Sequence, residues 1–307
     1  MNILKKLNAN DIIGIVAPAS SFDKDNFKRG VILIKKLGYK IKYERSIFNK
    51  CWSNPGHNKQ RAFQINRMFA NKEVKAIFCA KGGSGSSEII PYLDKQIIEQ
   101  NPKIFVGYSD ITTLLLYLQK VTNSIVFHGP VVSGEMFEGM HLDTINWLLR
   151  IIGDDITDAI IRHKNIKSIV NGKATGVLVG GNLSKIKECL HEYYALDDKD
   201  KILFLEDIKE EPEAINNLLR SLKEKGKFKN IKALLFGRML NCYEKEKEII
   251  SVIRECFKGV NFPVLFGFPS GHTESFEQVH YTLPLGVNVE LNSGDDCYIK
   301  FLENAVR

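Results

Sequence analysis

The chain has 307 residues, a formal charge of +7 at pH 7, 44% hydrophobic residues and 26% charged residues. This balance is typical of a globular protein with a large core, and it excludes a disordered or low-complexity chain. The basic residues are spread along the sequence, and a cluster such as Lys223, Lys225, Lys227 and Lys229 fits a solvated surface better than a nucleic-acid footprint. We therefore expect no nucleic-acid partner.

Neither the cysteines nor the apolar runs indicate an oxidising or membrane environment. The six cysteines, at positions 51, 79, 189, 242, 256 and 297, form no CxxC pair, and Cys79 ends an apolar run where we expect a buried thiol. The opening sequence MNILKKLNANDIIG is too polar for a signal peptide, and no apolar run approaches the roughly 20 residues needed to cross a bilayer. We expect a cytoplasmic protein with no membrane partner.

The first half of the chain alternates short apolar strands with helices. Strands are predicted at Ile12–Ala17, Tyr39–Tyr43, Val74–Ala80 and Ile104–Val106, and helices at Phe27–Leu37, Asn58–Ala70 and in the segment ITTLLLYLQ. This alternation predicts an α/β domain, residues 1–155, with a parallel sheet covered by helices on both faces, of Rossmann or flavodoxin-like type.

The second half has a different pattern. A charged segment without helical periodicity, residues 156–172, is predicted to link the first domain to a second one, residues 173–307. Apolar strands are expected at 174–181, 201–206, 231–237, 287–292 and 297–302. One helix begins near Pro212, with Ile215, Leu218, Leu219 and Leu222 on one face, and another covers Lys245–Cys256. We expect a smaller α+β domain with a mixed sheet or a barrel.

Ser109 lies between an apolar strand and an apolar helix, in the sequence Gly107-Tyr108-Ser109-Asp110. The carboxyl end of a parallel strand is where open α/β sheets bind ligands, and the free N–H groups of the next helix can stabilise an oxyanion. Two interpretations follow from the residues alone. Ser109 is a nucleophile on a strand–turn–helix elbow, or Ser109 or Asp110 simply caps the helix.

A serine nucleophile needs a base, usually a histidine held by a carboxylate. His272 lies in a small-residue loop after the apolar run PVLFGF, and His128 competes because it also follows a strand. Glu206 ends the run ILFLED, where a buried carboxylate needs a partner, but Asp207 is its neighbour. Structural roles stay open for all four. The remaining histidines, at positions 57, 141, 163, 191 and 280, are expected in loops or on helix surfaces.

A glycine-rich run, Lys81–Ser87, follows the strand at Val74–Ala80. It lacks the third glycine of a dinucleotide fingerprint and the GK[ST] of a P-loop, so we expect no nucleotide cofactor. If its N–H groups face Ser109, the run instead supplies the second half of an oxyanion hole. No HExxH or clustered Cys/His spacing indicates a zinc site, and we expect no metal.

A series of motifs along nearly the whole chain resembles the LD-carboxypeptidase family of serine peptidases, which also contains the microcin-immunity peptidases. The motifs are DIIGIVAPAS, IFCAKGGSGSSEIIPYLD, NPKIFVGYSDITTLLLYLQ, FHGP, GVLVGGNLSKI, ILFLEDIKEEPEAINNLLRSL, FGFPSGHT and TLPLGVNVEL. The resemblance implies a triad of Ser109, Glu206 and His272, in preference to Asp207 and His128. It also implies a two-domain fold whose first domain supplies the serine, no cofactor, and a homodimer.

For the oxyanion and substrate contacts, our hypothesis is the backbone N–H groups of Asp110, Gly82 and Gly83. One motif differs: Lys81-Gly82-Gly83-Ser84-Gly85 stands where the family usually reads RGGYG, so the backbone donors remain but the arginine and tyrosine side chains do not. FHGP and EDIKEEPEAI are more similar to the cell-wall enzymes than to the immunity branch. We therefore expect a carboxypeptidase that releases terminal D-alanine from murein tetrapeptides, a small muropeptide substrate, in cell-wall recycling. The alternatives are an immunity-type peptidase acting on peptidyl-nucleotides or acylated small molecules, and a catalytically silent muropeptide-binding protein.

Overall fold

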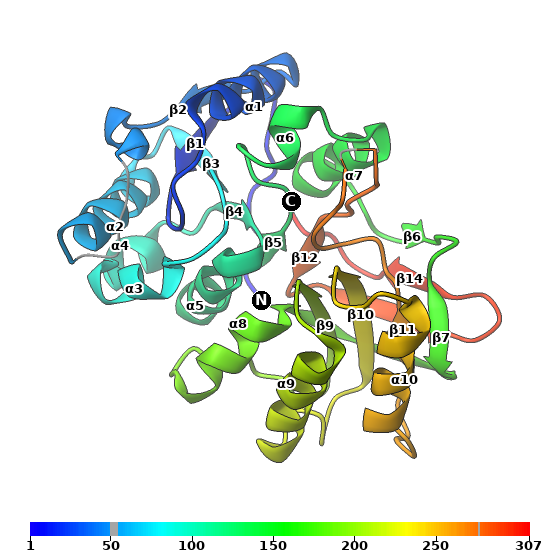
Figure 1. Ribbon diagram of the computed structural model, residues 1–307. Coiled ribbons are helices and arrows are strands. Elements are labelled where there is room, and N and C mark those ends of the chain that lie inside the picture. The colour runs from blue at the N-terminus through cyan, green and yellow to red at the C-terminus, as the bar shows by residue number, and fades with distance from the viewer. Residues whose placement is uncertain (50–54, 276) are drawn as a thin grey trace. The chain divides into compact units, whose positions relative to one another are not determined.

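The computed structural model describes residues 1–49, 55–275 and 277–307 (Figure 1). Contacts divide the chain into two units: unit 1 comprises Met1–Asp155, Phe276–Pro284 and Ala305–Arg307, and unit 2 comprises Ile156–Ser275 and Leu285–Asn304. Unit 2 thus begins where the linker was expected, and residues 156–172 carry two of its strands. Residues 276–284, which the sequence grouped with the second domain, belong to unit 1.

Unit 1 is built on a six-stranded sheet with the strand order β12-β5-β4-β3-β1-β2. The strands are β1 (Ile12–Val16), β2 (Lys40–Lys42), β3 (Val74–Cys79), β4 (Ile104–Gly107), β5 (Val126–His128) and β12 (Leu283–Leu285). The pairs β1–β2, β1–β3, β3–β4 and β4–β5 are all parallel. The order β2-β1-β3-β4-β5 is that of flavodoxin-like sheets, so the predicted α/β fold is confirmed.

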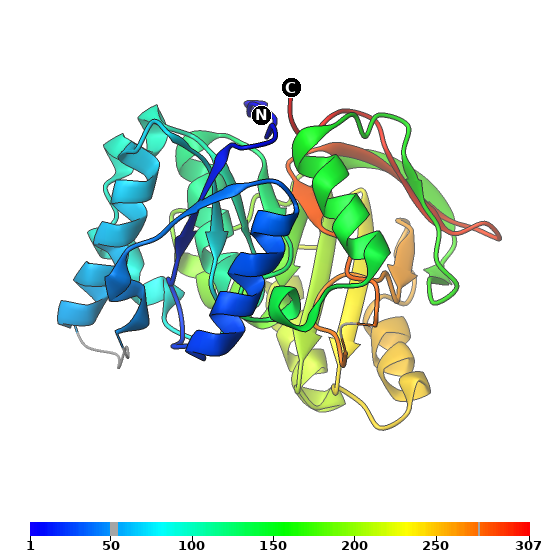
Figure 2. The same ribbon diagram turned by 90° about the horizontal axis from the view of Figure 1, so that it is seen from above.

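Helices cover both faces of this sheet, as Figures 1 and 2 show. The helices α1 (Lys24–Lys36), α6 (Glu135–Glu138) and α7 (Leu142–Gly153) follow β1 and β5. The helices α2 (Pro55–Ala70), α3 (Ser86–Ile89), α4 (Lys95–Gln100) and α5 (Thr112–Thr122) connect β2 to β5. Among the described residues, no helix combines the length and the apolar character needed to span a membrane.

The first helix shows how local sequence sets an element's bounds. The helix was predicted to begin at Phe27, whereas α1 begins at Lys24. The earlier start arises because the carboxylate of Asp23 accepts the N–H groups of Asp25 and Asn26 and so caps the helix. Phe27, Val31 and Ile34 form its buried stripe. The predicted helix was therefore correct in type and one turn short at its start.

Unit 2 is built on an eight-stranded sheet with the order β6-β14-β13-β8-β9-β10-β11-β7. The strands are β6 (Ile160–Ile161), β7 (Lys167–Val170), β8 (Gly172–Asn182), β9 (Lys201–Ile208), β10 (Ala233–Leu240), β11 (Val264–Phe266), β13 (Asn288–Ser293) and β14 (Tyr298–Phe301). The central strands β8 to β11 run parallel, whereas β6, β7, β13 and β14 pair antiparallel. The predicted mixed sheet is confirmed; β6 and β7 are edges, so the strands of the described chain do not close into a barrel.

Three helices accompany this sheet: α8 (Leu183–Glu188), α9 (Pro212–Glu224) and α10 (Glu246–Cys256). The predicted stripe of α9 is found, with Ile215, Leu219 and Leu222 fully buried, whereas Leu218 is half-buried. Cys79 is a buried free thiol as predicted, and its burial raises its pKa well above the ordinary value. The described cysteines are all unbridged, and Cys51 lies outside the described residues.

Candidate active site

Ser109 occupies a strained turn at the carboxyl edge of the unit 1 sheet. Strand β4 ends at Gly107, Tyr108 is extended, and Ser109 then has φ +63°, a left-handed conformation that is uncommon for serine. A short 3₁₀ turn, Ser109–Ile111, leads directly into α5. The N-cap residues of this turn and of α5 are Tyr108 and Ile111, so neither Ser109 nor Asp110 is a helix cap. Strain at a strand–turn–helix junction is a property of nucleophile elbows.

The glycine loop after β3 packs closely against this turn. A β-carbon added to Gly82 would lie 3.1 Å from Cβ of Ser109 and 3.3 Å from the carbonyl oxygen of Tyr108. Gly83 has φ +108°, and a β-carbon there would lie 2.3 Å from Oγ of Ser20. Glycine is therefore favoured at Gly83 by both its conformation and its space, and at Gly82 a side chain would press on the Ser109 turn.

Two hydrogen bonds, both donated by Ser86 and accepted by Asp110, join the glycine loop to the Ser109 turn. The N–H of Ser86 donates to Oδ2 of Asp110 at 2.9 Å, and Oγ of Ser86 donates to the carbonyl oxygen of Asp110 at 2.5 Å. Both residues are buried, at 0% and 2% exposure. We call this pair the Ser86–Asp110 clamp. It means that the side chain of Asp110 holds the glycine loop in place, a role that the sequence interpretation of Asp110 as a backbone donor missed.

The loop after β1 is tied into the same edge. The N–H of Ser20 donates to the carbonyl oxygen of Gly82 at 3.2 Å, and the N–H of Ser84 donates to Oγ of Ser20 at 3.0 Å. The buried Arg61 on α2 donates through Nη1 to the carbonyl oxygens of Pro18 and Ala19, at 2.8 and 3.1 Å. The loops after β1, β3 and β4 are thus one hydrogen-bonded assembly around Ser109.

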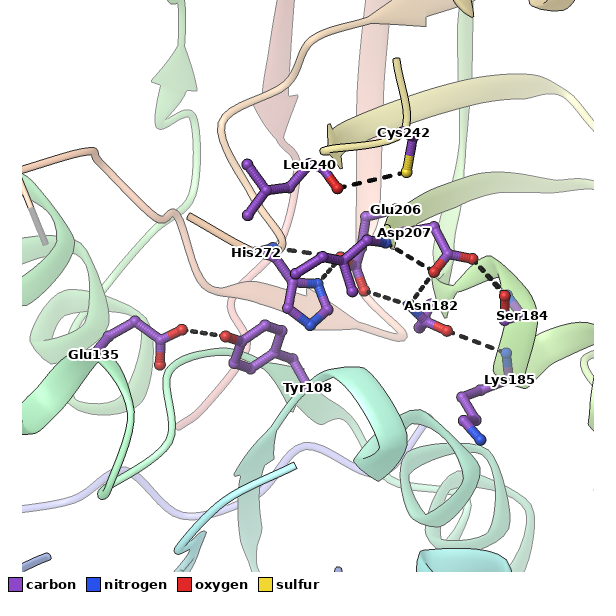
Figure 3. A network of polar contacts seen from close by, with 11 residues as sticks. Tyr108, Glu135, Asn182, Ser184, Lys185, Glu206, Asp207, Leu240, Cys242 and His272 are labelled. Atoms are coloured by element: carbon purple, nitrogen blue, oxygen red, sulfur yellow. Dashed lines mark hydrogen bonds and ion pairs between the residues drawn. The ribbon is translucent and has the colours of Figure 1, made fainter. Parts of the chain in front are cut away.

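In unit 2, Glu206 and His272 form a close pair. Glu206 lies near the end of β9 and is fully buried, and its Oε2 is 2.8 Å from Nδ1 of His272 (Figure 3). The backbone N–H of His272 donates to the same oxygen at 3.4 Å. A carboxylate accepting from Nδ1 holds the proton there and leaves Nε2 as the basic nitrogen of the ring. This is the relationship between acid and base in a catalytic triad.

Gly271 allows this pair to form. It has φ +101°, and a β-carbon at this position would lie 2.7 Å from Oε2 of Glu206. Any side chain here would displace the carboxylate that His272 contacts. The glycine before His272, which the sequence already marked as part of a tight loop, is therefore required by both conformation and space.

Asp207, the neighbour that the residues alone could not separate from Glu206, has other partners. Its Oδ2 accepts from the N–H and Oγ of Ser184, at 2.9 and 2.7 Å, and its Oδ1 accepts from the N–H of Ile208 at 2.8 Å. Burial raises the pKa of Asp207, and the negative charge of Glu206 adds to the increase. Asp207 therefore joins β9 to the start of α8, while Glu206 pairs with His272.

Asn182 connects the two carboxylates, and the sequence interpretation missed it. Its Nδ2 lies 3.2 Å from Oε1 of Glu206 and 3.1 Å from Oδ1 of Asp207, as Figure 3 shows, while its Oδ1 accepts the N–H of Lys185 and caps α8. The available signal was an asparagine between a glycine pair and a helical segment, in GVLVGGNLSKI.

The competing histidine, His128, lies inside unit 1. It is fully buried, and its ring packs against that of Tyr108 with centroids 5.6 Å apart. His280, expected in a loop or on a helix surface, is buried as well, and its ring lies 5.1 Å from that of Tyr108 and 6.1 Å from that of His128. The hydroxyl of Tyr108 donates to Glu135, which also accepts the N–H of Val131. This buried cluster behind the turn supports the backbone at Ser109.

The structure therefore gathers the candidate residues in two sets. Unit 1 brings together Ser109, Asp110, Gly82 and Gly83, and unit 2 brings together Glu206 and His272. Within the described ranges, no group of three or more His, Cys, Asp or Glu side chains is arranged to hold a metal ion. The chemistry available from these residues is that of a serine hydroxyl, a carboxylate-bound imidazole and backbone N–H donors.

Comparison with known proteins shows the family to which this chain belongs. Residues 13–129 match the LD-carboxypeptidase N-terminal domain, and residues 175–291 match the C-terminal domain of the same family. A probable murein peptide carboxypeptidase of Bacillus subtilis is 31% identical over 95% of this chain and 92% of its own length.

Two further proteins have solved structures. The microcin C7 self-immunity protein MccF of Escherichia coli is 28% identical over 93% of this chain and 92% of its own. A structure of MccF with aspartyl sulfamoyl adenosine covers all of both chains with a TM-score of 0.88 at 26% identity. A muramoyltetrapeptide carboxypeptidase from Oxalobacter formigenes covers 94% of this chain and 97% of its own, with a TM-score of 0.78 at 25% identity. With both domains matched in order and a relative of this identity along its length, the chain belongs to the LD-carboxypeptidase family of peptidases.

Proposed function

We propose that the protein is a serine LD-carboxypeptidase that releases the terminal D-alanine of murein tetrapeptides in cell-wall recycling, with Ser109, His272 and Glu206 as its triad. The observation that carries the proposal is the buried Glu206, whose Oε2 lies 2.8 Å from Nδ1 of His272. A buried carboxylate on an imidazole is the arrangement that makes a histidine an effective base for a serine hydroxyl. The left-handed conformation of Ser109 is a second, independent support.

In the proposed reaction, Nε2 of His272 takes the proton of Ser109 as Oγ attacks the carbonyl carbon of the L-configured residue. Glu206 keeps the other proton on Nδ1 and stabilises the imidazolium. The imidazolium then protonates the leaving amine of D-alanine, and the C–N bond breaks. Water, deprotonated by the same imidazole, hydrolyses the acyl-enzyme and restores the hydroxyl of Ser109.

The oxyanion of the tetrahedral intermediate would be held by backbone N–H groups of Asp110 and of the glycine loop at Gly82 and Gly83. Each such donor is worth on the order of 3 kcal/mol of transition-state stabilisation. The support for this assignment is the close packing of Gly82 on Ser109 and the Ser86–Asp110 clamp that fixes the two segments together. No step requires a metal or an organic cofactor.

A second candidate is an immunity-type peptidase that cleaves an acylated nucleotide. The similarity to MccF, with its TM-score of 0.88 in a complex with aspartyl sulfamoyl adenosine, favours it. The 31% identity to the Bacillus subtilis protein and the cell-wall-type motifs favour the murein substrate, and we rank that first. We further propose a cytoplasmic homodimer, which cell fractionation and light scattering test.

Mass spectrometry of products separates these functions. The purified protein is incubated with a murein tetrapeptide and, separately, with an aspartyl-adenylate analogue that has a hydrolysable bond. D-Alanine release by the wild type, and a loss of at least about 10³-fold in Ser109→Ala and in His272→Ala, supports the proposal. The matched controls, Ser251→Ala and His191→Ala, change exposed residues and should keep full activity. Cleavage of the adenylate alone would favour the second candidate, and tight muropeptide binding without turnover would indicate a silent binding protein.

A further inference from the structure

Unit 1 has a cavity at the edge of the sheet opposite to Ser109. Its volume is about 720 Å³, and it opens at the amino ends of three strands, beside Asp11 before β1, Val74 at the start of β3 and Ile104 at the start of β4. The Ser109 turn and the glycine loop follow the carboxyl ends of β4 and β3. The cavity is therefore separate from the candidate active site, and an inference about it does not rest on the proposed peptidase reaction.

Basic side chains dominate the lining of this cavity. They come from four segments of the chain and are Lys5, Lys6, Lys72, Lys75, Lys103 and Arg307. The one carboxylate side chain in the lining, Asp11, accepts the N–H of Asn8 at 2.8 Å. Across the described part of the chain, none of the six basic groups forms an ion pair. Like charges gathered without counter-ions repel one another, and an anion in the cavity would relieve this repulsion.

Lys103 is the most buried of the six basic residues. It is half-buried, and its Nζ donates to the carbonyl oxygens of Asn71 and Val74. Burial, as the largest cause, and the positive charges of Lys75 and Lys72 together lower its pKa to about 8. A purely structural lysine that caps these two carbonyls would account for Lys103 alone. Lys72 and Lys75 also have neutral acceptors, since Nζ of Lys72 donates to Oδ1 of Asn101 and Nζ of Lys75 donates to the carbonyl oxygen of Lys72 at 2.9 Å. None of these neutral acceptors offsets the six positive charges around one cavity.

We propose that this cavity binds a small anion that carries at least two linked phosphate groups, as in inorganic pyrophosphate or the diphosphate of a nucleoside diphosphate. The volume lies in the range of small-molecule sites. Lysine ammonium groups are compact point charges that bind phosphate oxygens from several directions, which suits a ligand whose charge is spread over two groups. The lining carries too few carboxylates to bind a cation.

Calorimetric titration of the whole protein at pH 8 and constant ionic strength tests the proposal with inorganic pyrophosphate as the probe. Saturable one-to-one binding is expected. Lys72→Gln combined with Lys75→Gln should weaken it roughly tenfold or more, since two charge-assisted contacts are lost. The matched control is Lys225→Gln with Lys229→Gln, which removes the same charge from exposed positions of unit 2 and should leave the affinity unchanged.

Two additional arms sharpen the test. A bound anion raises the pKa of Lys103 from about 8, so binding at pH 8 should take up a fraction of a proton, visible as a dependence on the ionisation enthalpy of the buffer. This uptake should disappear in Lys103→Met, and if that variant fails to fold, the Lys72/Lys75 variant still decides the question. Absence of saturable binding, an unchanged affinity in the Lys72/Lys75 variant, or equal binding of citrate would each overturn the assignment to a diphosphate.

Discussion

Ser86 donates two hydrogen bonds to Asp110, one from its backbone N–H and one from its Oγ, and both residues are buried. Asp110 directly follows Ser109, and Ser86 begins the helix after the glycine loop. The clamp therefore fixes the distance between the two backbone segments that we assign to the oxyanion hole. A shift of about 1 Å in such donors can reduce a rate by about 100-fold.

The first prediction concerns this clamp. Asp110→Ala leaves the buried N–H of Ser86 without its acceptor, so we expect a loss of about 1–3 kcal/mol in the free energy of unfolding and a fall of kcat by about 10–100-fold. Asp110→Asn keeps an acceptor oxygen and should restore most of kcat. Urea unfolding and steady-state D-alanine release measure the two effects. A variant that loses stability but keeps kcat would show that the clamp has no influence on the reaction.

The second prediction uses a matched pair of glycines. Gly271 and Gly226 both have positive φ, +101° and +76°, but a β-carbon at Gly226 would meet nothing within 4 Å, whereas one at Gly271 meets Glu206. Gly226→Ala should therefore lower the free energy of unfolding only by the cost of placing a β-carbon in a left-handed backbone conformation, about 1–2 kcal/mol, and kcat should not change. Gly271→Ala should lower the free energy of unfolding by more than this and reduce kcat at least about tenfold, because Glu206 and His272 must move apart. Equal kcat values for the two variants would contradict this account.

Much of the fold could be predicted because it is encoded in local patterns. The apolar runs at β1, β3, β4 and β9 and the stripe of α9 are where periodicity indicated them, and the alternation in unit 1 predicted a parallel sheet. The pairing of β12 beside β5 was not predicted, because a three-residue strand from near the end of the sequence has no local signal for its distant partner. The strands β6 and β7 were missed for the same reason, since both are short and lie at sheet edges.

The candidate site could also be predicted only in part. Residue types and strand ends pointed to Ser109, Glu206 and His272, and the family resemblance chose them over Asp207 and His128. The side chains that support them were not predicted: Asn182 between two carboxylates, Arg61 under two loops, and the buried group of Tyr108 and Glu135. Their partners are 24 to 43 residues away in the sequence, and such contacts arise only from the tertiary fold.

The third prediction tests the acid. Glu206→Gln keeps the shape but loses the charge that stabilises the imidazolium, and the amide can favour the wrong tautomer of His272. We expect kcat to fall by about 10³–10⁴-fold with little change in KM, as for the aspartate of serine proteases. Glu213→Gln on the exposed face of α9 removes the same charge and should keep full activity. Retention of wild-type kcat in Glu206→Gln would remove Glu206 from the triad.

The fourth prediction concerns pH and stability. Burial raises the pKa of Asp207 above its ordinary value of 3.8, and the charge of Glu206 raises it further, so in the pH range above 3.8 the folded protein binds more protons at this group than the unfolded chain does. Stability from this group is therefore greatest at low pH and decreases as the pH rises through the raised pKa. Asp207→Asn does not titrate, so the wild type should lose stability relative to this variant as the pH rises above about 4 and through the raised pKa of Asp207.

Urea unfolding of the wild type and Asp207→Asn across this pH range measures the difference, and titrating groups common to both proteins cancel in the comparison. Because Glu206 contributes to the raised pKa, the pH dependence of the difference should become smaller when both proteins also carry Glu206→Gln. A wild type that gains stability relative to the variant as the pH rises would mean that the hydrogen bonds from Ser184 and Ile208 outweigh burial, and that Asp207 is held as a stabilised carboxylate.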